Sequence, residues 1–167
     1  FSPADQASFI LDIEGLNHDL QVLEFTGKEA ISQPFRFDLK LVSESPDLDL
    51  ESLLHRMAFL GFDRHGAGIH GQVYSVGQGD AGKRLTQYQL CLMPSLAYLG
   101  HRFDHKIFQK LSVPQIIARV LENHGILSTA YRFTLGTDYQ PRDYCVQYGE
   151  SCLHFLQRLC EEEGLHY

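Results

Sequence analysis

Eight residues near the start of the chain constrain its fold more than any other feature of the sequence. Apolar side chains at every second position alternate with polar ones, and only the last residue breaks the alternation. Because successive side chains of a strand point to opposite faces, this pattern predicts a β-strand with one buried and one largely wet face. The apolar positions are Phe35, Phe37, Leu39 and Leu41, and the intervening positions are Arg36, Asp38, Lys40 and Val42.

Short apolar and β-branched segments separated by polar turns surround this strand. Residues 50–55 are expected to form one helical turn. Residues 77–82 are expected to form a turn, whose Gly-x-Gly lacks the third glycine and the following helix of a phosphate loop. Six or seven strands with short connections predict an antiparallel β-barrel, closed or nearly closed, since closure removes exposed edges. The further strands are predicted over residues 8–13, 20–25, 56–63, 69–76 and 85–93.

The pattern changes after residue 103. Ser112 and Gln115 form a capping box at the start of a predicted helix, which Gly125 ends. We therefore expect a first β-barrel domain over residues 1–103 and the start of a second, small α/β domain over residues 104–167. The apolar face of the helix comprises Ile116, Ile117, Val120 and Leu121, and short strands are predicted over residues 106–109 and 131–135.

The last part of the chain predicts a strand followed by a helix. The strand covers residues 144–148, and Gly149 is expected to end it. The helix begins at Ser151, a good N-cap, and stops at Gly164, which can adopt a left-handed conformation. The acidic run Glu161–Glu163 opposes the macrodipole at the helix C-terminus, and Arg158 is placed to offset it through i+3 or i+4 pairing. Residues 165–167 resemble the start of another strand.

This last segment resembles the signature of the VgrG family, the tip proteins of the bacterial type VI secretion apparatus, which are similar to hub proteins of contractile phage tails. The matching pattern is Tyr-Cys-Val-Gln-Tyr-x-Glu-Ser-x-Leu-x-Phe-Leu-x-Arg-Leu-x-Glu-Glu-Glu-Gly over residues 144–164. Phe25–Phe37 and Arg102–Ile117 fit the same family. Cys152 departs from the pattern, since such proteins usually carry an acidic residue after Glu-Ser.

The resemblance implies a structural role. Proteins of this family are built from two similar barrels with α/β insertions, followed by an oligonucleotide-binding-like domain and a β-helical spike. Three chains form a homotrimeric tip that docks on a hexameric Hcp-type tube, and effectors are attached through regions far C-terminal to the hub. This chain would then be the N-terminal hub part, made in the bacterial cytoplasm and translocated through the apparatus. The alternative within the same lineage is a contractile phage tail hub.

Composition agrees with a folded chain that does not bind nucleic acid or anionic membranes. The chain has 167 residues, of which 44% are apolar, enough for a sizeable core. Its net charge of −7 is spread thinly and forms no basic patch, which disfavours binding to nucleic acid or anionic membranes. The sequence has no run of about 18 apolar residues and no basic segment followed by an apolar one near its start, so neither a membrane span nor a secretory signal is expected.

Four cysteines are expected to be buried free thiols. The alternative is a zinc site formed by Cys145, Cys152, His154 and Cys160. Its spacing is unlike the usual pairs of close ligands. Cys152 and His154 are also two positions apart on a predicted helix, so their side chains point in different directions.

The remaining candidate groups do not converge on a catalytic pattern. His101 and His105 are four apart but lie in a segment that does not read as a helix, and His65 and His70 flank a glycine-rich turn. No Gly-x-Ser-x-Gly elbow is present. We therefore expect a non-enzymatic protein without catalytic, cofactor or metal residues. The alternative from another class is a metal-dependent hydrolase using His101 and His105. Carboxylate pairs would require the fold to unite Asp63 with Asp80, or Glu150 with Glu163.

Overall fold

The computed structural model of the chain describes residues 9–63, 65–82 and 84–167, which form two compact units. Unit 1 comprises Phe1–Ala30 and Pro34–Pro94, and unit 2 comprises Ile31–Gln33 and Ser95–Tyr167. The sequence places the domain boundary after residue 103, whereas the compact units divide after Pro94. The 3-10 helix η1 (Ser95–His101) accounts for the difference, because its Leu99 is buried in the core of unit 2.

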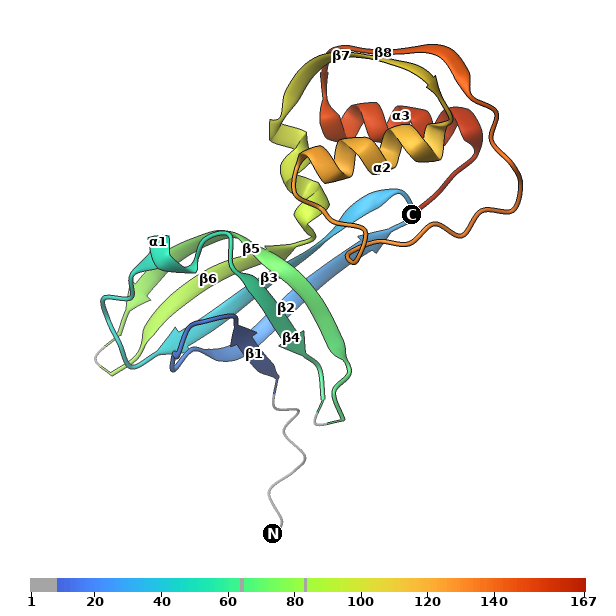
Figure 1. The fold of residues 1–167 in the computed structure, drawn as a ribbon. Coiled ribbons are helices and arrows are strands. Elements are labelled where there is room, and N and C mark those ends of the chain that lie inside the picture. The colour runs from blue at the N-terminus through green and yellow to red at the C-terminus, as the bar shows by residue number, and fades with distance from the viewer. Residues whose placement is uncertain (1–8, 64, 83) are drawn as a thin grey trace. The chain divides into compact units, whose positions relative to one another are not determined.

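Unit 1 is a curled antiparallel half-barrel, which confirms the predicted fold class (Figure 1). Its six strands follow the order β1-β4-β5-β6-β3-β2 across one sheet. A single helical turn, α1 (Leu50–Leu53), occurs where the sequence predicts one. The strands are β1 (Ile10–Ile13), β2 (Gln21–Ala30), β3 (Gln33–Ser43), β4 (Met57–Gly61), β5 (Gly68–Ala81) and β6 (Thr86–Met93).

The alternating residues of β3 build the centre of this unit. Phe37, Leu39 and Leu41 all point inward and are at most 5% exposed. Antiparallel pairing places each of them opposite an inward residue of β6, so the two strands contribute one continuous apolar layer. Each such side chain contributes about 1.5–3 kcal/mol when fully buried. The pairs are Phe37 with Leu92, Leu39 with Leu90, and Leu41 with Tyr88.

Aromatic side chains bring the two edges of the half-barrel together. Phe25, on edge strand β2, contacts Phe9, which precedes edge strand β1, with ring centroids 4.9 Å apart. Phe25 also stacks on Phe62, just after β4, at 5.4 Å. Gly27 makes room for this cluster, because a Cβ there would lie 2.4 Å from the Phe37 ring. The close approach of the Phe37 ring therefore requires a glycine at this position.

The predicted turn at residues 77–82 is wrong. Strand β5 continues to Ala81, and Gly77 and Gln78 pair with Gln89 and Tyr88 of β6. A register shift between Gln78 and Ala81 accommodates the glycine-rich sequence within the strand. The turn falls later, where the Gly82 N–H donates to the Leu85 carbonyl at 2.9 Å. At the other end of the unit, β1 begins at Ile10, and Ser8 lies outside the described residues.

Unit 2 is a two-stranded antiparallel ribbon with helices on one face (Figure 1). The ribbon consists of β7 (Phe103–Leu111) and β8 (Arg142–Ser151), and the helices are α2 (Val113–Asn123) and α3 (Cys152–Glu163). Phe108 of β7 stacks on Phe155 of α3, with ring centroids 5.7 Å apart. Other core residues come from both helices and from Cys145 of β8. None of the helices in the described residues is long and apolar enough to cross a membrane.

The helix starts of unit 2 follow the sequence, whereas its strand ends do not. The Ser112 backbone N–H donates to Gln115 Oε1 at 2.9 Å, as the capping box predicts. Gly149, expected to end β8, instead adopts a positive φ of 64° inside the strand, beside a register shift between Asp104 and Lys106. The strand predicted at residues 131–135 is wrong, because this segment is irregular, and residues 165–167 form no strand either.

Candidate functional site

The signature-like segment 144–164 forms the joint between the ribbon and helix α3. Ser151 caps the helix, since its Oγ accepts the His154 N–H at 3.1 Å. Gly164 ends it in a left-handed conformation with φ 67°. Both caps confirm the sequence prediction. They fix where the helix leaves the strand, so the segment is first of all an architectural element.

Two arginines neutralise the acidic end of helix α3. Arg158 bonds Glu162 at 2.9 Å, as the i+4 spacing predicts, and also bonds Glu150 at 2.7 Å. Arg142 of β8 bonds Glu162 at 2.6 Å and Glu163 at 2.5 Å. Hydrogen bonding by Arg158 lowers the pKa of Glu150, and hydrogen bonding by Arg142 lowers the pKa of Glu162. The acidic run therefore ties the helix to the ribbon.

A buried polar cluster lies at the N-terminus of α3. Gln147 is only 1% exposed, and its Nε2 donates to the Glu150 carbonyl at 3.3 Å and to Cys152 Sγ at 3.4 Å. On its other side, Cys152 Sγ lies 3.3 Å from His124 Nε2. Burial lowers the pKa of His124, and the positive charges of Lys106 and Arg102 lower it further. This cluster links the C-terminal end of α2 with α3 and β8.

The residues of the alternative zinc site are not brought together as ligands. Cys152 faces His124, while His154 pairs with Glu150 at 3.0 Å on the surface. Burial raises the pKa of both Cys145 and Cys160. Across residues 9–63, 65–82 and 84–167, no group of three or more His, Cys, Asp or Glu side chains could hold a metal ion. All four cysteines are buried free thiols.

The other candidate groups have separate local roles. His105 contacts the Tyr148 ring at 5.0 Å, and His70 contacts the Phe59 ring at 4.6 Å. Asp63 accepts the N–H groups of His65 and Ala67 in the β4–β5 loop. Glu150 and Glu163 belong to the same charge network but bond different arginines. His101 ends η1, and Asp80 lies within β5. Within the part of the chain that the structure describes, none of these side chains belongs to a group that could hold a metal ion.

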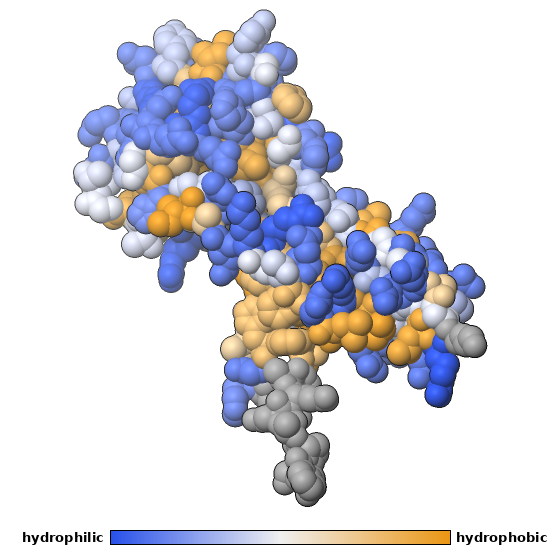
Figure 2. Space-filling model, turned by 180° about the vertical axis from the view of Figure 1, so that it is seen from behind, coloured by the Kyte–Doolittle hydropathy of each residue, from blue (hydrophilic) through white to orange (hydrophobic). Residues whose placement is uncertain are grey.

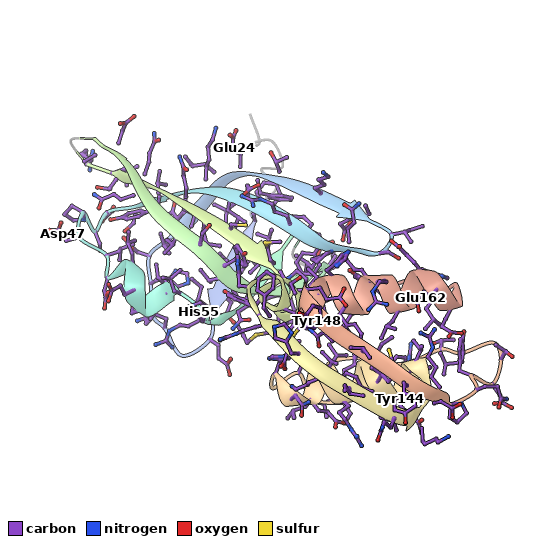
Figure 3. The ribbon with its side chains drawn as sticks, turned by 90° about the horizontal axis from the view of Figure 1, so that it is seen from above. Glu24, Asp47, His55, Tyr144, Tyr148 and Glu162 are labelled. Carbon is purple, nitrogen blue, oxygen red and sulfur yellow. The ribbon has the colours of Figure 1, made fainter. Side chains whose placement is uncertain are left out.

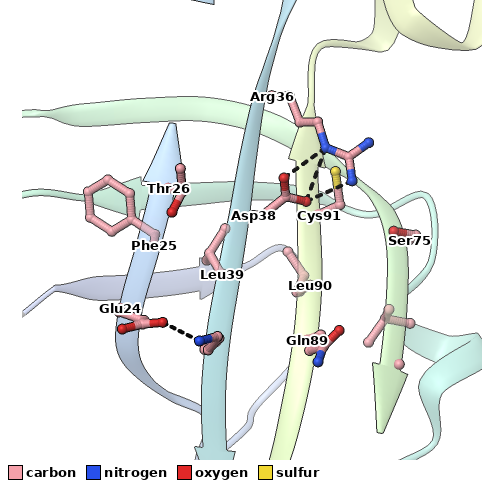
Figure 4. Close-up of a pocket in the computed structure, with 13 residues that line it drawn as sticks. Glu24, Phe25, Thr26, Arg36, Asp38, Leu39, Ser75, Gln89, Leu90 and Cys91 are labelled. Atoms are coloured by element: carbon pink, nitrogen blue, oxygen red, sulfur yellow. Dashed lines mark hydrogen bonds and ion pairs between the residues drawn. The ribbon is translucent and has the colours of Figure 1, made fainter. Parts of the chain in front are cut away.

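Unit 1 carries a groove of about 500 Å³ across the outer face of strands β2, β3, β6 and β5 (Figure 4). Its charged side chains pair with each other: Arg36 Nη2 bonds Asp38 at 2.8 Å, and Lys40 pairs with Glu24. Burial raises the pKa of Cys91, at the groove floor, to about 11, which keeps the thiol protonated. The groove therefore offers neither an unpaired charge among these four groups nor a reactive thiolate.

The half-barrel followed by a ribbon with two helices defines the class of phage tail hub proteins. The chain belongs to the phage tail baseplate hub (GPD) family, whose model matches residues 28–167. It is 63% identical over 167 residues to the type VI secretion system spike protein VgrG4b of Pseudomonas aeruginosa, and 64% identical over 168 residues to VgrG5 of that organism. Each match covers all of this chain and 21% of the relative, so the chain spans about a fifth of their length.

Solved structures show the same fold. The E. coli c3393 protein is a component of the type VI secretion system that exhibits structural similarity to the T4 bacteriophage tail proteins gp27 and gp5. It matches with a TM-score of 0.84 and 29% identity, over 92% of this chain and 43% of that one. The 43 kDa tail protein of prophage MuSo2 from Shewanella oneidensis matches with a TM-score of 0.65 over 95% of this chain and 51% of that one. At 17% identity, the latter likeness concerns the fold alone.

Proposed function

We propose that this chain is the N-terminal hub part of a VgrG-like spike protein of a type VI secretion system. The observation that carries the proposal is the 63–64% identity with two such spike proteins over the whole chain. The TM-score of 0.84 with a type VI secretion component supports the same role. In this role the chain is structural and non-enzymatic, and residues 1–103 and 104–167 are the first hub barrel and the start of the next domain.

The proposal includes partners and a route. In the full-length protein, three chains form the hub, which docks on a hexameric Hcp-type tube, and effectors are carried by regions far C-terminal to it. The protein is made in the bacterial cytoplasm and is then translocated through the secretion apparatus. The actin cross-linking toxin VgrG1 of Vibrio cholerae is 36% identical to this chain, but the match covers only 16% of that protein. The resemblance therefore concerns the hub and not the toxin activity in that protein's name.

A chimeric protein tests the proposal. The matching fifth of Pseudomonas aeruginosa VgrG4b is replaced by this chain, and the chimera is expressed in a strain that lacks the native gene. We expect the chimera to appear in the culture supernatant together with the Hcp-type protein, as shown by immunoblotting. The matched control carries Leu92→Asp, which places a carboxylate at a fully buried position of the half-barrel and is expected to abolish secretion.

Two outcomes would contradict the proposal. The first is a chimera that folds and accumulates but is not secreted, although the native protein is secreted when it is expressed in that strain in place of the chimera. The second is co-purification of the chimera with phage tail tube protein instead of the Hcp-type protein, which would favour the phage tail hub alternative.

A further inference from the structure

The buried polar cluster at the start of helix α3 connects three elements of unit 2 by hydrogen bonds. Gln147 belongs to β8, Cys152 is the first residue of α3, and His124 caps the C-terminal end of α2. We name these three side chains the α2–α3 cluster. Figure 3 shows α3 running back beside β8, with Tyr148 near the start of the helix and Glu162 near its end. The cluster therefore lies at the opposite end of α3 from the ion pairs of Glu162.

The donors and acceptors of the α2–α3 cluster fit together in one consistent order. The Glu150 carbonyl can only accept, so the Gln147 amide presents Nε2 to it, at 3.3 Å. The second hydrogen of the same Nε2 group points to Cys152 Sγ, at 3.4 Å. The thiol hydrogen is then available for His124 Nε2, at 3.3 Å. The opposite tautomer of His124 would aim a second N–H at the sulfur, so this order requires a neutral ring that carries its proton on Nδ1.

The surroundings of His124 oppose its protonation. A protonated Nε2 would face a sulfur that already accepts the Gln147 amide, and the thiol hydrogen would lose its acceptor. Burial lowers the pKa of His124, and the positive charges of Lys106 and Arg102 lower it further. The charge of Asp104 acts in the other direction, but its carboxylate is paired with Lys106 at 2.5 Å. Lys106 is opposite Gln147 in the β7–β8 register, so this cation lies on the same side of the ribbon as the cluster.

We propose that the α2–α3 cluster is a pH-sensitive latch, which holds the end of α2 against α3 while His124 is neutral and releases it when His124 is protonated. This inference goes beyond the proposed function and does not depend on it. The face of unit 2 seen in Figure 2 is mostly hydrophilic, and two members of the cluster lie beneath the surface. Gln147 and Cys152 are each 1% exposed, whereas His124 is half-buried, so a proton from solvent reaches the cluster at His124.

The structure on the two sides of the latch confines the release to the end of α2. Gly125 follows His124 with a positive φ of 78°, so the backbone leaves the helix directly after the cluster. Residues 126–141 form neither helix nor strand, so no ladder of backbone hydrogen bonds holds His124 in place from that side. Helix α3 keeps its Ser151 cap, which does not involve the latch. Release therefore uncovers Cys152 Sγ while α3 stays folded.

Thiol labelling at two pH values tests the latch on the chain itself. The probe is 4,4′-dithiodipyridine, which reacts with thiols in acid as well as at neutral pH, and mass spectrometry of the digested protein identifies the labelled cysteine. The reference is His124→Gln, since a glutamine can accept the thiol hydrogen but cannot be protonated. A released His124 has its ordinary pKa of 6.5, so protonation at pH 5 favours the open state by at most about thirtyfold. Relative to His124→Gln, we therefore expect Cys152 labelling in the parent to accelerate by about threefold to thirtyfold between pH 7 and pH 5.

Controls within unit 2 separate a local release from general unfolding. Cys145 and Cys160 lie in the same core and are 6% and 8% exposed, so both should stay unlabelled at pH 7 and at pH 5. The NMR signal of His124 Cε1–H follows the titration directly, and we expect its midpoint below 6.5. Lys106→Gln removes a cation that faces His124 and should raise this midpoint, whereas Lys110→Gln, near the other end of β7, should leave it unchanged.

A second pair of variants does not require His124→Gln to fold. Cys152→Ala removes the thiol hydrogen and should move the midpoint of His124 upward, whereas Cys152→Ser keeps a donor and should move it less. The proposal is overturned if Cys152 labelling has the same pH dependence in the parent and in His124→Gln, or if Cys145 and Cys160 are labelled together with Cys152. It is also overturned if Lys106→Gln and Cys152→Ala both leave the His124 midpoint where it is in the parent.

Discussion

At the scale of single residues, Arg142 and Arg158 explain why three consecutive glutamates can end helix α3. Carboxylates at a helix C-terminus are disfavoured by the macrodipole and by one another. Arg142 reaches them from β8 and Arg158 from the preceding turn, and both bond Glu162. The interaction therefore joins the end of the helix to the start of the strand that precedes it in the chain.

Substitution of Arg142 tests how much its ion pairs contribute to the free energy of unfolding. Arg142→Gln loses ion pairs with two glutamates and leaves them beside each other, so we expect the free energy of unfolding to fall by about 1 kcal/mol. The control in the same ribbon is Lys110→Gln, whose ion pair with Asp143 has both side chains 77% exposed and should change stability by less than about 0.5 kcal/mol. Urea unfolding followed by circular dichroism compares them. An equal effect of the two substitutions would show that the Arg142 pairs add nothing beyond surface charge.

The same pairs predict a pH dependence. The pKa values of Glu150 and Glu162 are lowered below the ordinary 4.5, chiefly by Arg158 and by Arg142 respectively. A carboxyl group with a depressed folded-state pKa contributes stability above its unfolded pKa, and that stability is lost as the pH falls through the folded value. We therefore expect the urea midpoint to fall between pH 5 and pH 3, and to fall less in Arg158→Gln than in the parent. The lowered pKa of His124 also costs stability as the pH falls below its ordinary value of 6.5. Arg158→Gln keeps His124, so the difference between the two proteins reports on the carboxyl groups. If the urea midpoint falls equally with pH in both proteins, the ion pairs of Arg158 do not contribute to the pH dependence.

At the scale of elements, local sequence explains starts and caps better than strand ends. Alternation at residues 35–42, the capping box at Ser112 and the caps of α3 depend on near neighbours, and each occurs as predicted. Strands β5 and β8 run through glycines because partner strands supply their hydrogen bonds, and that information lies elsewhere in the chain. The i+4 contact of Arg158 with Glu162 is readable from spacing. The contact of Arg142, twenty residues from Glu162, is not.

The ribbon face, which exposes Ile107 of β7 and Tyr144, Val146 and Tyr148 of β8, could not be predicted from the sequence for a similar reason. Tyr144, Val146 and Tyr148 alternate with Cys145 and Gln147, but all but one of these residues are apolar or aromatic. Hydropathy alone therefore does not say which set faces the core. Packing of α3 on Cys145 and Gln147 makes that choice, and it leaves the tyrosines in solvent.

Helix α2 provides a direct test of the amphipathic prediction. Ile116 is fully buried, and an aspartate there would place a carboxylate in the core without a partner, at a cost of several kcal/mol. We expect Ile116→Asp to unfold unit 2, whereas Ile107→Asp, at a position 66% exposed on the ribbon face, should leave it folded. Dispersion of methyl resonances in NMR spectra reports on unit 2 directly. Parent-like spectra for Ile116→Asp would mean that α2 does not pack through this residue.

At the scale of the whole molecule, the described residues form two hydrophobic cores that share no buried side chain. One lies in the half-barrel around Leu39, Leu60 and Leu92, and the other lies between the ribbon and its helices around Ile116 and Phe155. Two long surfaces could contact another chain: edge strand β2 in unit 1 and the ribbon face in unit 2.

Neither feature is sufficient for stable self-association of this chain. Edge strand β2 carries Glu24, Lys28 and Glu29, and charged residues on an edge discourage pairing with another copy. The ribbon face presents roughly 300 Å², well below the area that a stable partner contributes. We therefore predict a monomer of 19.0 kDa at micromolar concentration. The trimer proposed for the full-length protein would then depend on contacts made by the rest of that protein.

Light scattering coupled to size-exclusion chromatography measures the molar mass of the chain at about 50 µM and again after about tenfold dilution. A weak complex dissociates over this range, so its average mass falls. The Ile107→Ser, Tyr148→Ser variant serves as the control, since it removes the larger apolar contribution without touching β2. A monomer mass for both proteins at both concentrations agrees with the prediction. A trimer mass that persists on dilution in both would contradict it, and would show that the half-barrel carries trimer contacts by itself.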